Sequence, residues 1–140
     1  MRAKEVRDAI VSALEAITPD EVAHGGDVFR QAPSAMDEPP SDRTFHLERT
    51  SPQSVAGLLM AGADPYSISF DLGVTYVPTP KLEDRLLDDG DLVVDALKNL
   101  SATQTQVLKT EITGGADLED PGGNRVVIWN INVVYDRRST

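Results

Sequence analysis

The chain of 140 residues contains no cysteine. It therefore has no disulfide, no thiolate nucleophile and no cysteine ligand for a metal, which fits a protein made in a reducing cytosol. Histidine is scarce as well, since His24 and His46 are the only two, and their spacing does not match a zinc site. Nucleophile-elbow, dinucleotide-binding and P-loop patterns are also missing. We therefore expect a protein that is not an enzyme and that has no cofactor and no bound metal.

Long apolar runs and an excess of basic residues are missing too. No segment has the roughly 20 consecutive apolar residues of a membrane-spanning helix, and the charged N-terminus leads into an amphipathic pattern instead of a signal peptide. Thirteen Lys and Arg residues stand against 23 Asp and Glu residues, which gives a net charge of −10. Nucleic-acid binding requires a basic surface, so the chain is not expected to bind nucleic acid and should repel DNA at long range.

The clearest structural signal lies in residues 67–77. Apolar and polar residues alternate there, which is the period of a strand with one buried face. Pro78 and Pro80 end the pattern, because proline cannot donate to a strand ladder. We expect this strand to be the centre of the fold, with five residues on its buried face: Ile68, Phe70, Leu72, Val74 and Tyr76.

Residues 81–100 have the period of a helix with one apolar stripe. Gly90 interrupts the stripe and leaves two alternatives, a continuous helix or two short helices that meet at residues 88–91. Because the stripe keeps its phase across the glycine, the continuous helix is favoured. The stripe consists of Leu82, Leu86, Val93, Leu97 and Leu100.

The N-terminal half contributes weaker patterns. Residues 3–17 have a helical apolar stripe that ends at Thr18-Pro19, and residues 43–49 alternate as a strand with His46 on its polar face. Residues 28–29 are a candidate short strand. Residues 51–62 begin with a serine N-cap and a proline, so they are either a short helix or an ordered loop.

The C-terminal part predicts a hairpin. Residues 104–113 alternate as a strand, residues 114–124 are dense in turn residues and predict a long hairpin loop, and residues 125–135 repeat the design of the central strand. The second face of that last strand is only partly polar, because Asn130 and Asn132 share it with apolar residues. The strand is thus expected to be partly covered on both sides, by the fold or by another subunit. The apolar residues on its second face are Val126, Ile128 and Val134.

Together these patterns predict one α+β domain over residues 1–140. A single, mostly antiparallel sheet of four to five strands would pack against two helices on one of its faces. An arm at residues 32–42 and the hairpin loop at residues 114–124 would extend from it.

The arm is rich in proline and has neither a helical nor a strand period. Two interpretations are open: a plain surface loop, or an arm that becomes ordered on a neighbouring subunit. The second interpretation makes four of its residues candidate contacts with a subunit or partner: Pro33, Met36, Pro39 and Pro40.

Two acidic clusters remain, at residues 88–91 and 117–120. The first lies on the predicted helix, where adjacent side chains point around the circumference, and it lacks the alternating ligands of a calcium-binding helix-loop-helix. The second lies in the predicted hairpin loop. It is interpreted either as a solvated acidic loop or as a calcium site. The residues of this second cluster and the two asparagines of the last strand are further candidate contacts with a subunit or partner: Asp117, Leu118, Glu119, Asp120, Asn130 and Asn132.

The order of these elements resembles a known family. An N-terminal helix, a proline-containing arm, a long alternating strand, an acidic helix ending in LVVDAL at residues 92–97 and a last strand ending in WNINVVYDR at residues 129–137 are similar to the tail terminator (tail completion) proteins of long-tailed phages and phage-like particles. The resemblance implies a hexameric ring that caps the tail tube, stops its polymerisation and provides the docking surface for the head connector.

The resemblance also implies partners and a location. The partners would be other copies of the chain, the major tail tube protein and the head-closure or connector protein, with DNA passing through the lumen. The protein would be assembled in the host cytoplasm and reside in the tail or neck of the virion. Three other hypotheses stay open: a head-closure or neck adaptor subunit, a small monomeric protein-binding module, and a hydrolase that uses carboxylates alone.

Overall fold

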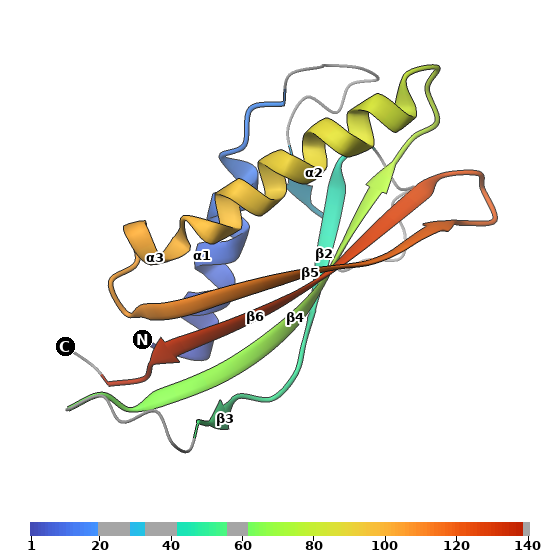
Figure 1. Ribbon diagram of the computed structural model, residues 1–140. Coiled ribbons are helices and arrows are strands. Elements are labelled where there is room, and N and C mark those ends of the chain that lie inside the picture. Colours follow the sequence, from blue (N-terminus) through green and yellow to red (C-terminus); the bar gives the residue numbers. More distant parts are fainter. Residues whose placement is uncertain (20–28, 33–41, 56–61, 139–140) are drawn as a thin grey trace.

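The computed structural model describes residues 1–19, 29–32, 42–55 and 62–138. In this part of the chain, helices pack on one face of a single twisted sheet (Figure 1). The predicted contacts Pro33, Met36, Pro39 and Pro40 lie outside the described residues. The elements, in order, are α1 (Ala3–Glu15), β1 (Arg30–Gln31), β2 (Thr44–Arg49), β3 (Gln53–Ser54), β4 (Pro65–Tyr76), α2 (Leu82–Lys98), α3 (Leu100–Thr103), β5 (Val107–Glu119) and β6 (Arg125–Asp136).

The sheet has the strand order β1-β2-β4-β6-β5, and β3 pairs with β4 beside this path. The β1–β2 pair is parallel, and the other pairs are antiparallel. The α+β class and the mostly antiparallel sheet are therefore confirmed. The sheet has six described strands instead of four to five, because β1 and β3 contain two residues each and are too short to show a period.

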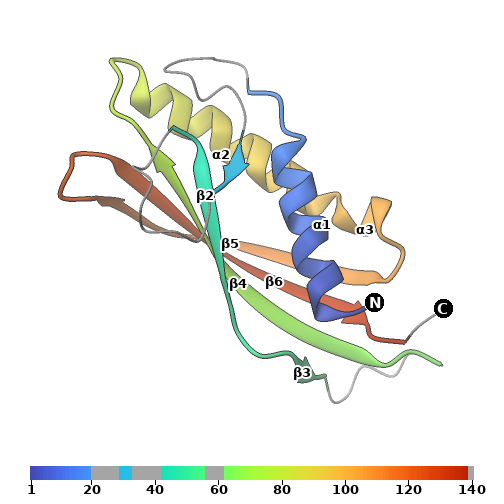
Figure 2. The ribbon, with the colours of Figure 1, turned by 180° about the vertical axis from the view of Figure 1, so that it is seen from behind.

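Strand β4 is the centre of the sheet, as expected. It pairs with β6 along its whole length, from Pro65 opposite Asp136 to Tyr76 opposite Arg125. The five apolar residues predicted for its inner face are all buried. They form one core with residues of α1, α2 and β6, so both helices lie on the same face of the sheet, as Figure 2 shows from behind. The partners from those elements include Val6, Ile10, Leu14, Val93, Leu97, Ile131 and Val133.

Helix α2 runs without interruption through Gly90, which confirms the continuous helix. The glycine has a packing role, because a Cβ atom at this position would lie 3.3 Å from Cη2 of Trp129 on β6. Helix and sheet thus approach each other closely at this point. None of the described helices is long and apolar enough to cross a bilayer.

Of the two alternatives for residues 51–62, the short helix is wrong, because residues 53–54 form β3 and pair with β4. The remainder of that segment, residues 56–61, lies outside the described residues.

The predicted hairpin loop at residues 114–124 is too long, because β5 continues to Glu119. Its pairing with β6 shifts register between Gly114 and Asp117, which marks a β-bulge, and a second shift lies between Val107 and Lys109. A Cβ atom on Gly115 would lie only 2.7 Å from the carbonyl oxygen of Ile128. Gly115 therefore serves a close approach of two strands inside the sheet, whereas Gly122 and Gly123 lie in the turn that follows.

Candidate protein-interaction site

The tip of the β5–β6 hairpin is a tight turn organised by Asp120. The backbone N–H groups of Gly122 and Asn124 each donate to Oδ1 of Asp120 at 2.9 Å, and the Asn124 side chain donates to Oδ2 at 3.3 Å. The carboxylate of this predicted contact residue is therefore used within the turn, which makes Asp120 a structural residue of the tip.

Asp117 is likewise engaged inside the molecule. Arg125 donates from Nε and Nη2 to the two oxygens of Asp117, at 2.9 and 2.6 Å. The same guanidinium donates to Glu83 in the first turn of α2 at 2.9 Å. These hydrogen bonds, that to Asp117 first, raise the pKa of Arg125. Arg125 therefore ties the hairpin to the start of α2.

Leu118 and Glu119, the last two residues of β5, are the predicted contact residues whose side chains are exposed, and as neighbours on a strand they point to opposite faces of the hairpin. The Leu118 side chain is 51% exposed, and Glu119 is exposed without a hydrogen bond or ion pair among the described side chains. The exposed leucine and the carboxylate lie directly before a turn that is held by internal hydrogen bonds, so this end of the hairpin presents a small and well-ordered contact surface.

Asn130 and Asn132 lie on the sheet face opposite the helices. Asn130 Nδ2 donates to Asp71 at 3.1 Å, and the Ser69 hydroxyl donates to Asn132 at 3.0 Å. Both pairs join residues directly opposite each other on β4 and β6. The asparagines therefore stabilise the sheet through cross-strand pairs, and the structure does not bring them together with the hairpin tip.

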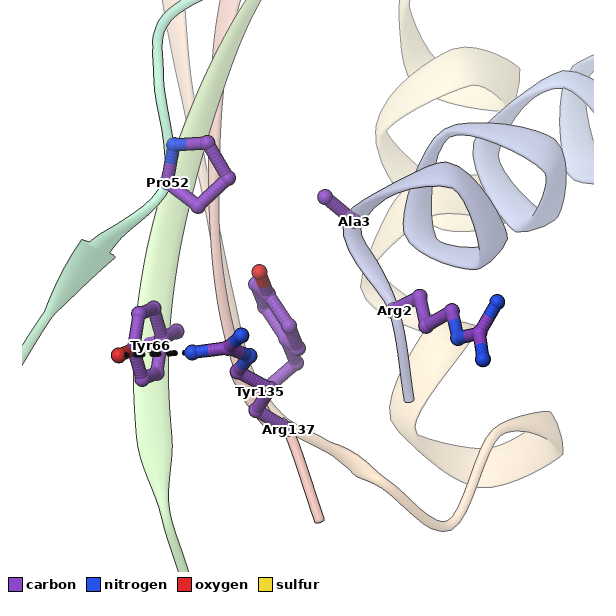
Figure 3. A pocket seen from close by; sticks show the side chains of 6 residues that line it. All are labelled: Arg2, Ala3, Pro52, Tyr66, Tyr135 and Arg137. Carbon is purple, nitrogen blue, oxygen red and sulfur yellow. Dashed lines mark hydrogen bonds between the residues drawn. The ribbon is translucent and has the colours of Figure 1, made fainter. Parts of the chain in front are cut away.

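A pocket that the sequence analysis missed lies where the N-terminus of α1 meets the ends of β4 and β6. It has a volume of about 550 Å³ and is lined by Arg2, Ala3, Pro52, Tyr66, Tyr135 and Arg137. Figure 3 shows the two tyrosines and Arg137 on the sheet side and Ala3 on the helix side, while the Arg2 side chain points away from the tyrosines.

The tyrosines and Arg137 form the polar and aromatic wall of this pocket. Tyr66 and Tyr135 are register partners with ring centroids 6.4 Å apart. Arg137 is exposed, donates to the Tyr66 hydroxyl at 3.0 Å and lies 4.9 Å from the centroid of that ring. Burial raises the pKa of Tyr135, and the charge of Arg137 opposes this effect. The pocket thus combines aromatic surface with an accessible cation.

The backbone beneath the pocket is fixed by Asp136. Its Oδ1 accepts hydrogen bonds from the backbone N–H groups of Asp64 and Arg138, at 3.1 and 3.0 Å, and the Arg138 guanidinium donates to Oδ2 at 2.7 Å. The Arg138 side chain and these backbone donors hold the pKa of Asp136 well below its usual range. The ammonium of Met1 donates to the carbonyl oxygens of Asp136 and Arg138, at 3.0 and 3.1 Å.

Two buried ion pairs between α2 and the two residues before β2 were also missed. Arg43 pairs with Asp89 through two hydrogen bonds, at 2.8 and 3.2 Å, and Arg85 pairs with Asp42. All four side chains are almost completely buried. Burial and the charge of Asp89 raise the pKa of Tyr76 beside them. These pairs lie inside the fold and are structural.

The acidic cluster at residues 88–91 does not converge on one point. Asp89 turns inward to Arg43, whereas Asp88 and Asp91 are exposed. Within residues 1–19, 29–32, 42–55 and 62–138, no group of three or more His, Asp or Glu side chains is placed to hold a metal ion. His46, on the outer face of β2, is exposed as expected for its strand position.

The described geometry therefore offers two surfaces for contacts with other proteins, the outward side of the hairpin tip and the tyrosine–arginine pocket. A comparison with known protein families finds no family model that matches the chain, and a comparison with curated proteins finds no significant match.

Proposed function

We propose that this protein is a tail terminator subunit of a long-tailed phage or phage-like particle. In this role it joins a hexameric ring that caps the tail tube, stops tube polymerisation and provides the docking surface for the head connector. The element order supports the proposal. A helix, a long central strand, an acidic helix and a two-stranded hairpin follow one another, in the order for which the sequence resembles the tail terminator family.

The observation that carries the proposal is the partly apolar outer face of the sheet. Val126 and Ile128 lie opposite Thr75 and Gly73 on the face that the described helices do not cover. A solvated face of an antiparallel sheet is usually polar, so apolar residues at this position favour a face that meets another protein. A cavity of about 170 Å³ lies beside them, lined in part by His46 and Asp71.

The charge distribution fits the passage of DNA through such a ring. The solvent side of α2 carries five exposed carboxylates, and the whole chain has a net charge of −10. A lumen lined by carboxylates would repel phosphates, and DNA would slide through without binding. The exposed carboxylates on α2 belong to Glu83, Asp84, Asp88, Asp91 and Asp95.

The test is polymerisation of the tail tube protein of the same particle, with and without this chain. We expect tubes of limited length with the chain bound at one end, measured by electron microscopy, and a capped complex by light scattering. Ile128→Lys should abolish capping while keeping the circular dichroism of the fold. Leu87→Lys, at an exposed leucine on α2, is the control and should cap normally. Tubes that keep growing with no bound chain would overturn the proposal.

The pocket favours a second candidate, a small monomeric binding module or a neck adaptor. Its aromatic wall and exposed Arg137 suit a short acidic segment of another protein. The same experiment separates the candidates. A module would stay monomeric and ignore the tube, whereas a head-closure adaptor would bind the connector protein in place of the tube.

A further inference from the structure

The geometry points to a contact between copies of this chain, in which the hairpin tip of one copy docks in the tyrosine–arginine pocket of the next. The hairpin contributes Leu118 and Glu119, and the pocket contributes Pro52, Tyr66 and Arg137. The inference rests on the proposed function in one respect, since it names the subunit contact of the proposed ring.

The two surfaces lie at opposite ends of the sheet. Figure 1 shows the β5–β6 turn at one end and, at the other, the N-terminus and the end of β6, beside which the pocket lies. Strand β6 joins these ends through 12 residues, which is roughly 40 Å at the rise of an antiparallel strand. The tip of one molecule therefore cannot reach its own pocket, and a contact between the two surfaces requires two copies.

The chemistry of the two surfaces is complementary. Leu118 is one of two large apolar side chains that are mostly exposed in the described part of the chain, and a carboxylate follows it directly. The pocket offers the half-buried ring of Tyr66 and the exposed Pro52 to the leucine, whereas Tyr135 beside them is almost completely buried. Exposed Arg137 offers a guanidinium to the carboxylate of Glu119. In a chain of net charge −10, a site with an exposed cation is a favoured position for an acidic tip.

Size and rigidity also favour this contact. The pocket volume of about 550 Å³ lies within the range of roughly 300–1,000 Å³ that is typical of binding clefts, so it has room for a leucine with part of its neighbour. The tip is held in shape by the hydrogen bonds of Asp120 and Arg125. Little conformational freedom is therefore lost on docking.

A contact between two different surfaces has a defined consequence for assembly. Such a head-to-tail interface leaves a free tip on one copy and a free pocket on the other, so addition continues until the chain of copies closes into a ring or extends as a filament. A twofold contact would stop at a dimer.

The absence of native cysteine gives a direct test by disulfide trapping. Leu118→Cys in one sample and Pro52→Cys in another should form a covalent heterodimer when mixed under oxidising conditions, because a disulfide requires Cα atoms within about 7 Å. A chain with both substitutions should form a covalent ladder. The control pair is Leu118→Cys with Ser101→Cys, an exposed position on α3. A heterodimer yield no higher than that of the control, or a preferred Leu118→Cys homodimer, would overturn the contact.

A charge exchange provides the second test, with association followed by sedimentation over a range of concentrations. Glu119→Arg and Arg137→Glu should each weaken association at least about tenfold, and the two substitutions combined in one chain should restore it. Glu111→Arg, on the same strand but away from the tip, is the control. Unchanged association in both single variants would overturn the contact, and so would Arg137-dependent binding of an acidic peptide without self-association.

These tests separate the contact from the proposed function. Normal tube capping without trapping at positions 118 and 52 would reject the contact and leave the function standing. Specific trapping by a chain that fails to cap tubes would support the contact and reject the function.

Discussion

Arg43 donates from Nε to Oδ2 of Asp89 at 2.8 Å, and the two side chains are only 0% and 2% exposed. Arg43 precedes β2 with a positive φ of 58°, and Asp89 lies in the middle of α2. Burial alone would disfavour the charged guanidinium, but the hydrogen bond and charge of Asp89 raise the pKa of Arg43 above its ordinary value. The pair therefore joins the helix layer to the sheet through two charges that depend on each other.

Asp89→Leu should be strongly destabilising. It leaves the buried guanidinium of Arg43 without this carboxylate, and loss of one partner of a buried pair costs about 3–5 kcal/mol of unfolding free energy. Arg43→Met combined with Asp89→Leu should recover most of the loss. Urea denaturation followed by fluorescence of Trp129, the only tryptophan, measures the change. The exposed control, Asp88→Leu, should stay within about 0.5 kcal/mol of the wild-type unfolding free energy. An equal loss of unfolding free energy in Asp88→Leu and Asp89→Leu would contradict the prediction.

Asp136 predicts a loss of stability in acid. Its folded pKa lies below the ordinary value of 3.8, so the unfolded chain binds more protons between the two values and stability rises with pH there. The contribution is complete above about pH 5 and disappears as pH falls through the folded pKa. Asp136→Asn should therefore lower the unfolding free energy at pH 7 and lower it less at pH 3, and it should approach wild type only as the pH falls through the folded pKa of Asp136. The exposed control Asp95→Asn should change the unfolding free energy little at either pH. A difference in unfolding free energy between Asp136→Asn and wild type that grows as the pH falls would contradict the prediction.

Gly90→Leu should force α2 and β6 apart. A Cβ atom at position 90 already lies 3.3 Å from the Trp129 ring, so a leucine has no room unless the ring moves. Overpacking of this kind costs about 1–3 kcal/mol, which exceeds the gain of about 1 kcal/mol from replacing a helical glycine. Thermal unfolding measures the balance, and a changed Trp129 emission maximum reports the ring displacement. Asp91→Leu, one position further and exposed, should show neither effect.

Arg125→Leu should loosen the hairpin and leave the core intact. The substitution removes the hydrogen bonds that tie β5 to the first turn of α2. Hydrogen exchange should become faster at the backbone amides of residues 114–119, while the amides of β4 keep their protection. Lys109→Leu breaks an exposed ion pair on the same strand and should leave the hairpin unchanged. Slow exchange at residues 114–119 in Arg125→Leu would show that the sheet alone holds the hairpin.

The main elements could be predicted because their apolar periods are long. Strand β4 and helix α2 each bury a regular stripe, and one period is enough to assign each element. The buried ion pairs could not be predicted, because charged residues on a helix usually face solvent. Yet the buried positions Arg85, Asp89, Val93 and Leu97 are spaced by four residues. Two charges in phase with an apolar stripe were the available signal.

The candidate site was predicted in part. The sequence led to the hairpin at residues 117–120, but could not separate Asp117 and Asp120, which are bonded internally, from outward Leu118 and Glu119. The pocket depends on register, because Tyr66 and Tyr135 are 69 positions apart in the sequence and become neighbours only when β4 pairs with β6. Gly114 and Gly115, two of the four glycines of the predicted loop, were misinterpreted, since turns and bulges share this residue type.

The irregular pairing of β5 has a consequence for solubility. Among the described strands, β5 pairs with β6 alone and thus forms an edge of the sheet. A long straight edge invites strands of other molecules and leads to aggregation. The two register shifts of β5 interrupt the regular row of backbone donors and acceptors. The irregular edge is therefore a poor template for the strand of another molecule, which disfavours joining sheet to sheet.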